Sequence, residues 1–171
     1  MITLGVAARL AEEKGFEYLF EAMNIIGLHV RLWGAGSIDP VGEEKYKNII
    51  MNLVSKMGDR VKFLGNLDQV ELKNFYRDID ILVVPSINST EAFGIVQVEA
   101  MMQDTPVVAS NLPGVRVPIL KTGMGELCEP ENPESIAKAI IKVAKTKYEN
   151  TAKNLFVPKL SYEKYRSVIL S

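Results

Sequence analysis

Short, continuously apolar runs alternate with longer amphipathic stretches along nearly the whole chain. A strand that is apolar at successive positions is typical of a parallel sheet, because helices cover both faces of such a sheet. The alternation therefore predicts an α/β fold, a doubly wound and mostly parallel Rossmann-like sheet with helices on both faces. The predicted strands are Ile2 to Ala8, Leu28 to Trp33, Val61 to Leu64, Ile79 to Val84, Pro106 to Ala109 and Gly125 to Cys128.

Helical spacing and capping residues define the segments between these strands. Asp68 followed by Glu71 is typical of a capping box, and Asn132 before Pro133 supplies an N-cap and a proline in the first turn. The predicted helices are Phe16 to Ile26, Asp39 to about Met57, a helix after Asp68, Ile95 to Met102, Pro133 to Thr146, and Ser161 to Leu170 after a polar connector from Tyr148 to Lys159.

Composition bounds the size and the class of the protein. With 171 residues, the chain is predicted to form one domain over residues 1–171, large enough to bury a core without disulfides. A net charge of −1 excludes a broad basic field for nucleic acid. One cysteine, Cys128, and one histidine, His29, exclude a disulfide framework, a multi-cysteine zinc site and a histidine cluster.

Other single features predict structure or location. Cys128 is expected to be a small buried hydrophobe, His29 a core or edge histidine of a strand, and Trp33 a sheet-packing residue. We find no export signal and no apolar run long enough for a membrane span, so we expect a cytoplasmic protein.

Ligands of doubly wound sheets bind at the carboxyl ends of the strands. Loops 8–15, 34–38, 65–68, 85–94 and 110–117 are predicted to lie there. In the first of these loops, Arg9 follows a strand and Lys14 precedes a helix. Both cations can converge on the helix N-terminus, and an arginine fork with a lysine point charge suits a diphosphate. The alternative is surface charge that pairs locally with Glu12 and Glu13.

The loop before residue 95 carries the most information. An apolar strand runs into a polar loop and a glycine, and then a helix begins. Phe93, Gly94 and Ile95 would present unpaired backbone N–H groups to sugar hydroxyls or phosphate oxygens. Glu99 lies one turn inside an otherwise apolar helix, where a carboxylate needs a partner such as a ribose diol. The alternatives are a half-exposed Glu99 that pairs with a nearby cation, and surface charge for Glu91.

Glu91 and Glu99, within Glu-Ala-Phe-Gly-Ile-Val-Gln-Val-Glu-Ala-Met, resemble the signature of retaining glycosyltransferases of the GT-B fold, in particular the group 1 family of sugar-nucleotide transferases. The resemblance extends from residue 2 to residue 170. Further similar pieces, in family order, are Ala8-Arg9-Leu10, Glu13-Lys14-Gly15, Gly34-Ala35-Gly36, Val61 to Gly65, Pro106 to Ser110, Leu112 to Val115 and Asn132-Pro133-Glu134.

The resemblance implies roles for individual residues. Arg9 and Lys14 would hold the donor diphosphate, Glu99 would bind the ribose, and Glu91 would lie beside the donor sugar. The remaining implied donor contacts are the Gly-rich loop at Gly34, the backbone of Phe93, Gly94 and Ile95, the backbone near Phe63 and Leu64 at the base edge, and Leu72 over the base.

The resemblance also implies an organisation and a chemistry. The chain would be the C-terminal, donor-binding half of the enzyme, and residues 160–171 would form a helix that packs on an N-terminal domain outside this sequence. The enzyme would transfer a sugar with retention from a nucleotide-diphosphate sugar to a glycan or lipid-linked acceptor, at the inner face of a membrane in some cases. Positive side chains and N–H groups aimed at the departing diphosphate need neither metal nor cofactor.

Two departures from the family pattern and several alternatives remain open at this point. Ala8 replaces a glycine, and Asp104 stands where glycine is usual and is expected to adopt the left-handed conformation. The Asp78-Ile-Asp80 and Gly34-Ala-Gly36 patterns are read as turn and loop residues, not as metal or dinucleotide sites. The alternative functions are a GT-B-like sugar-nucleotide epimerase, a non-catalytic sugar-nucleotide-binding module, and an unrelated Rossmann protein.

Overall fold

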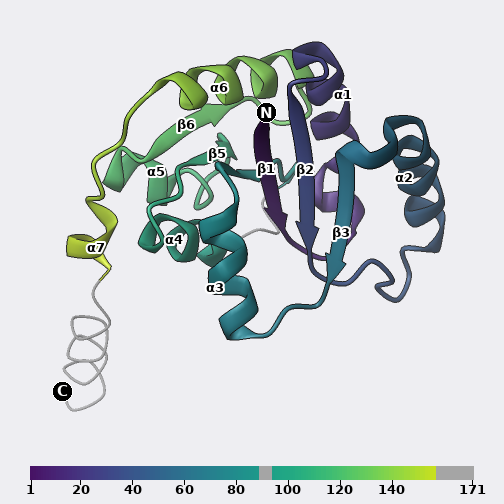
Figure 1. The fold of residues 1–171 in the computed structure, drawn as a ribbon, viewed down its shortest axis with the longest axis horizontal. Helices are drawn as coiled ribbons and strands as arrows, with labels where there is room; N and C mark the ends of the chain where they lie inside the picture. Colours follow the sequence, from purple (N-terminus) through teal and green to yellow (C-terminus); the bar gives the residue numbers. More distant parts are fainter. Residues whose placement is uncertain (89–93, 157–171) are drawn as a thin grey trace.

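Six parallel strands form one sheet in the order β3-β2-β1-β4-β5-β6 (Figure 1). The structure is a computed structural model and describes residues 1–88 and 94–156. The predicted fold class, a doubly wound parallel sheet with helices on both faces, is confirmed. The strands are β1 (Ile2–Ala7), β2 (Val30–Ala35), β3 (Val61–Gly65), β4 (Ile81–Val84), β5 (Val107–Ser110) and β6 (Gly125–Cys128).

Helices cover both faces of this sheet (Figure 1). The apolar residues of α1, α2 and α6 form one core with one face, and those of α3, α4, α5 and α7 form a second core with the other face. The helices are α1 (Phe16–Ile26), α2 (Glu44–Met57), α3 (Gln69–Asp78), α4 (Ile95–Met102), α5 (Val117–Thr122), α6 (Pro133–Lys145) and α7 (Ala152–Leu155), with short 3-10 turns η1 (Glu12–Lys14) and η2 (Gly58–Arg60).

Neighbouring residues of β4 explain why the strands are apolar throughout. Ile81 and Val83 pack into the core with α1 and α6, whereas Leu82 and Val84 pack into the core with α3 and α4. All four side chains are buried. Because successive side chains point to opposite faces, a strand covered on both sides must be apolar at odd and even positions alike.

The predicted caps are confirmed in atomic detail. The Asp68 carboxylate accepts hydrogen bonds from the backbone N–H of Val70 and Glu71, and the Glu71 carboxylate accepts one from the N–H of Asp68 at 2.9 Å. Asn132 Oδ1 accepts from the N–H of Ser135 at 2.9 Å. Both caps satisfy backbone donors that would otherwise have no partner at a helix start.

Several predicted boundaries are wrong. His29 is an exposed turn residue and not a strand residue, because Gly27 ends α1 with a φ of 89° and the chain needs two further residues before β2. The helix expected from Asp39 starts only at Glu44. The sequence did not predict α5, a short helix with Pro118 in its first turn and a left-handed Gly123 at its C-cap, because its six residues carry too little periodicity to detect.

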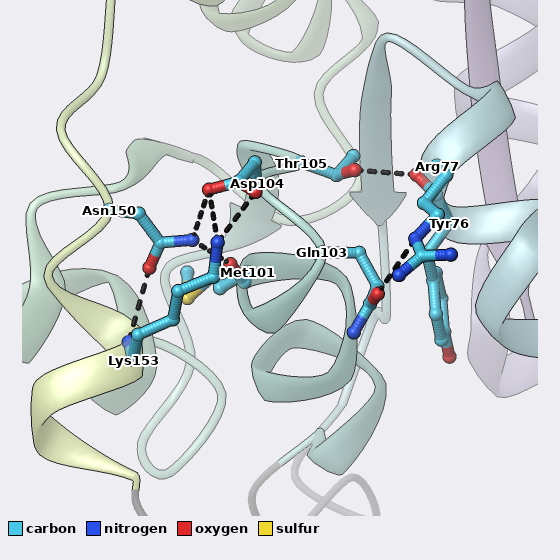
Figure 2. Close-up of polar contacts among 8 residues, drawn as sticks. All are labelled: Tyr76, Arg77, Met101, Gln103, Asp104, Thr105, Asn150 and Lys153. Carbon is cyan, nitrogen blue, oxygen red and sulfur yellow. Dashed lines mark hydrogen bonds and ion pairs between the residues drawn. The ribbon is translucent and has the colours of Figure 1, made fainter.

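The predicted connector from Tyr148 to Lys159 contains α7, which is clamped onto the end of α4 (Figure 2). Asn150 Nδ2 donates to the carbonyl of Met101 at 2.8 Å, and Lys153 Nζ contacts both carboxylate oxygens of Asp104. Asp104 adopts the expected left-handed conformation with a φ of 70°. The helix predicted from Ser161 to Leu170 lies outside the described residues.

Candidate functional site

The order of the strands places a crevice beside β1. This strand pairs with β2 on one side and with β4 on the other, so the chain reverses its direction of winding between β1 and β4. The carboxyl ends of strands at such a switch point are where doubly wound sheets bind ligands. In Figure 1 the arrowheads of β1, β2 and β3, which mark their carboxyl ends, lie at the lower edge of the sheet.

Two glycines let the loops at this edge approach each other closely. A Cβ at Gly36, whose φ is 134°, would lie 2.3 Å from the carbonyl oxygen of Ala8. A Cβ at Gly15, whose φ is 64°, would lie 2.4 Å from the carbonyl oxygen of Pro85. Only glycine fits either position, because space and backbone conformation both exclude a side chain. The loops after β1, β2 and β4 therefore form one continuous rim.

A cleft of about 430 Å³ lies on the β2 and β3 side of this rim. We call it the Arg9 cleft. It is lined by Arg9, Gly36, Ser37, Asn66 and Leu72, together with small apolar residues. The lining combines apolar residues with a few polar side chains, as is usual in small-molecule sites.

Arg9 forms an ion pair with Glu13 within its own loop, so the local-pairing alternative describes the structure as it stands. The Arg9 side chain is nevertheless 53% exposed and borders the cleft. An exposed pair of this kind contributes little stability, typically about 0–1 kcal/mol. A diphosphate could therefore compete with Glu13 for the guanidinium at small cost.

A smaller cavity, of about 20 Å³, lies at the switch point itself. Lys14, Ser86 and Val96 line it together with the ends of β1 and β4. The Ser86 side chain is only 1% exposed, and its hydroxyl has no hydrogen-bond partner within the described part of the chain. A buried hydroxyl without a partner is unusual and marks this cavity as a place where a polar group is accommodated.

Glu99 lies in a second cleft of about 430 Å³ between α3 and α4, which we call the Glu99 cleft. Its lining includes Leu72, Tyr76, Glu99 and Phe156. Leu72 lines the Arg9 cleft as well, so the two clefts adjoin at this residue. The Tyr76 hydroxyl donates a hydrogen bond to Glu99 Oε2 at 2.8 Å. Burial and this bond raise the pKa of Tyr76, which therefore stays protonated and acts as the donor.

The N-terminus of α4 begins at Ile95, directly after Gly94. Gly94 is the N-cap in the left-handed conformation, with a φ of 65° and no side-chain capping bond. Ile95, the first residue of the helix, is exposed. Glycine has no side chain that could cap the first N–H groups of the helix, and the N–H of Gln97 donates to the Gly94 carbonyl at 2.9 Å. Glu91 and Phe93 lie outside the described residues.

Three of the predicted contact residues, Gly34, Phe63 and Leu64, take part in packing within the protein. Gly34 lies within β2, and a Cβ there would lie 2.6 Å from the Phe63 ring. Phe63 in turn packs against Phe16 on the α1 face, with ring centroids 6.3 Å apart, and Leu64 packs into the opposite core. The glycine at the cleft is Gly36, which the Gly34-Ala-Gly36 pattern contained but which we did not single out.

Sequence reasoning also missed Ser37, Asn66, Ser86 and Tyr76 as lining residues. Asn66 directly follows β3 and Ser86 lies two residues after the end of β4, so a position just after a strand was a usable signal. Tyr76 carried none, because a tyrosine on the apolar face of a helix is usually a core residue.

No acidic or histidine cluster suggests a metal centre in residues 1–88 and 94–156. Asp80 accepts the backbone N–H of Thr3 at 2.7 Å and so acts as a turn residue between α3 and β4. Among the described helices, none has the length and apolarity to cross a membrane.

Comparisons with known proteins agree with this geometry. The profile of the family "Glycosyl transferases group 1" matches residues 2–166. A glycosyltransferase of Methanocaldococcus jannaschii, MJ1607, is 38% identical over 139 residues, which are 79% of this chain and 34% of that protein. A D-inositol 3-phosphate glycosyltransferase of Corynebacterium efficiens is 35% identical over 106 residues, which are 62% of this chain and 24% of that protein. The matched residues thus span about a third of the first relative and about a quarter of the second.

Solved structures share the fold. Sucrose-phosphate synthase of Thermosynechococcus elongatus matches with a TM-score of 0.84 and 29% identity over 99% of this chain and 46% of that chain. Anabaena HepE in complex with UDP and glucose matches with a TM-score of 0.76 and 26% identity over 88% of this chain and 40% of that chain. By the match to residues 2–166, this chain belongs to the group 1 family of glycosyltransferases.

Proposed function

We propose that this chain is the nucleotide-sugar-binding part of a retaining glycosyltransferase. The observation that carries the proposal is the position of α4 at the switch point. Lys14 and Val96, from the first turn of α4, line the small cavity there, and Glu99 lies about one turn further along the same helix. A nucleoside diphosphate needs positive charge at its phosphates and hydrogen-bond acceptors for its ribose hydroxyls. Lys14 supplies the positive charge, and the Glu99 carboxylate supplies the acceptors.

Each end of the donor has its own contacts in this proposal. Arg9 and Lys14 hold the diphosphate, with the N–H groups at the start of α4. Glu99 accepts hydrogen bonds from the ribose, and the base lies near Leu72, where the Arg9 cleft and the Glu99 cleft adjoin. The HepE structure, solved with UDP and glucose, supports a uridine nucleotide as the first ligand to test.

The chemistry follows from charge. When the bond between the sugar and the diphosphate breaks, negative charge builds on the departing phosphate. Cations and oriented N–H groups at that position stabilise the transition state more than the bound donor, which is what accelerates a reaction. In this scheme Glu91 positions the donor sugar. Retention of the configuration at the sugar carbon is inferred from the family, and the scheme requires no metal ion.

The acceptor site is proposed to lie in the rest of the protein, because this chain spans only part of its relatives. We propose a glycan or lipid-linked acceptor, a cytoplasmic location, and contact of the whole protein with a membrane surface. The isolated chain is then expected to bind donor and to show little transfer.

The test is calorimetric titration of the chain with UDP, GDP and ADP and with their glucose conjugates. One base series is expected to bind, and Glu99→Ala is expected to weaken that binding about tenfold or more. Glu126→Ala is the matched control, because Glu126 pairs with Lys142 at the far edge of the sheet. Equal affinity of Glu99→Ala and wild type would overturn the assignment of Glu99, and no binding of any nucleotide would overturn the proposed function of the chain.

A further inference from the structure

The Glu99 carboxylate is held by one specific donor. The Tyr76 hydroxyl lies 2.8 Å from Glu99 Oε2, and Tyr76 itself is 2% exposed. A carboxylate offers about four lone-pair sites on two oxygens. The tyrosine occupies one of them, so within residues 1–88 and 94–156 the remaining sites, including both on Oε1, are left for groups in the Glu99 cleft.

Tyr76 is fixed at both ends. Thr105 Oγ1 donates a buried hydrogen bond to the Tyr76 carbonyl (Figure 2). The next residue, Arg77, donates from Nε to Gln103 Oε1 at 3.1 Å. The phenol ring also makes an edge contact with Phe75, with centroids 5.5 Å apart. The C-terminal part of α3 is therefore tied to the turn after α4, and the Tyr76 hydroxyl has a fixed position relative to Glu99.

A fixed donor restricts the orientation of the acceptor. A half-buried glutamate on a helix surface has several rotamers, each of which aims the carboxylate differently. The bond to Tyr76 favours those in which Oε2 points to α3 and Oε1 faces the cleft. An acceptor pair with a fixed direction fits two adjacent hydroxyl groups better than it fits one.

We infer that Tyr76 is a positioning residue, which orients the Glu99 carboxylate so that the cleft selects a vicinal diol and hence a ribonucleotide over a 2′-deoxyribonucleotide. This inference rests on the proposed function and adds a specificity determinant to the same site. Tyr76 makes no contact with the ligand in this inference, because its hydroxyl hydrogen is donated to Glu99.

The test compares UDP with 2′-deoxy-UDP as ligands of the chain. Wild type is expected to bind UDP about tenfold more tightly, since a hydrogen bond to a charged group is lost with the 2′-hydroxyl. Tyr76→Phe removes only the hydroxyl. It is expected to weaken UDP binding severalfold and to leave 2′-deoxy-UDP binding nearly unchanged, so that the preference shrinks. A purely structural role would weaken both ligands equally.

Two further variants make the outcome unambiguous. Tyr18→Phe is the matched control, because the Tyr18 hydroxyl also donates to a glutamate, Glu131 at 3.1 Å, but on the opposite face of the sheet. It should leave the preference intact. In a Glu99→Gln background, adding Tyr76→Phe should change the preference no further, because Tyr76 acts only through residue 99.

Each result decides. If Tyr76→Phe folds and keeps the full preference for UDP, the inference is overturned and the proposed function stands. If wild type binds UDP and 2′-deoxy-UDP equally, the inference is overturned as well, whereas donor binding is retained. If wild type binds neither nucleotide, the proposed function fails first and the inference falls with it.

Discussion

Lys153 Nζ lies 2.9 and 2.7 Å from the two carboxylate oxygens of Asp104, although the residues are 49 positions apart in sequence. Asp104 also accepts a hydrogen bond from Asn150 and adopts a φ of 70° (Figure 2). This left-handed conformation strains an ordinary residue. A glycine would relieve the strain but would lose the contacts to α7. The contacts of the Asp104 carboxylate with Asn150 and Lys153 therefore offset the backbone strain and hold the segment that contains α7 against the end of α4. We call these contacts the clamp.

Opposite effects are expected from removing the two partners of this clamp. Lys153→Met should lower the free energy of unfolding by about 0.5 kcal/mol, because an exposed ion pair is lost. Asp104→Gly should leave it unchanged or raise it, because relief of left-handed strain is worth about 1 kcal/mol. Urea unfolding at low and high salt measures both, and the Lys153→Met effect should shrink with salt. A large loss in Asp104→Gly would show that the clamp outweighs the strain.

The pH dependence of the clamp follows from the Asp104 carboxyl. Hydrogen bonds from Lys153 and Asn150 lower the pKa of Asp104. A lowered folded-state pKa contributes stability that is present above the unfolded value, about 3.9, and is lost as the pH falls through the folded value. The difference in unfolding free energy between wild type and Asp104→Asn should be constant near neutral pH and should close below about pH 4. Asparagine tolerates the left-handed conformation, so the backbone is controlled. A difference that persisted at pH 2 would contradict this origin.

The fold was predictable because its main determinant is local. The six apolar runs each became a strand, and Asp68 and Asn132 cap helices as expected. The predictions were wrong where tertiary contacts determine the secondary structure. The α7 helix exists because Ala152 is fully buried against α4 and Lys153 reaches Asp104, and neither contact can be seen in a polar stretch of sequence.

The site was predictable only in part, for a similar reason. Arg9 and Lys14 border cavities at the carboxyl edge of the sheet, as their places in the loop after a strand suggested, and Glu99 borders the adjoining cleft between α3 and α4. The ion pair from Arg9 to Glu13 and the bond from Tyr76 to Glu99 depend on side-chain conformation. The four-residue spacing left the first of these contacts open as an alternative, whereas spacing along the chain carries no information about the second.

Gly36 should be far less tolerant of substitution than a glycine in open space. Gly36→Ala would place a Cβ 2.3 Å from the Ala8 carbonyl oxygen and should lower the free energy of unfolding by roughly 3 kcal/mol. Gly42→Ala is the control, because its φ of 88° is also left-handed but nothing lies within 4 Å of the added carbon. It should cost only about 1 kcal/mol. Equal losses in thermal or urea unfolding would show that the close approach of the two loops is not maintained in solution.

Burial should make Cys128 unreactive in the folded protein. Desolvation raises the pKa of the thiol to about 12, so almost no thiolate is present at neutral pH. A thiol-specific chromogenic reagent should therefore label the native chain only at the rate of unfolding, and should label it at once in denaturant. Rapid labelling under native conditions would contradict the burial of β6 against the α6 core.

Substitution of Ser86 should affect the melting temperature and the affinity for UDP differently. Its hydroxyl is buried without a partner in the described residues, so Ser86→Ala removes a desolvated polar group and should leave the melting temperature unchanged or raise it. The same change removes a donor from the cavity beside Lys14, and UDP affinity should fall severalfold. Calorimetry of both properties on one preparation separates them.

Ser110→Ala serves as the comparison for this change, because Ser110 is equally buried at the end of β5 but does not line that cavity. It should leave UDP affinity unchanged. A Ser86→Ala protein that binds UDP as tightly as wild type would show that the hydroxyl faces no ligand atom. A protein that loses stability would show instead that the hydroxyl is bonded in the folded chain, since removing a satisfied buried hydrogen bond costs about 1 kcal/mol.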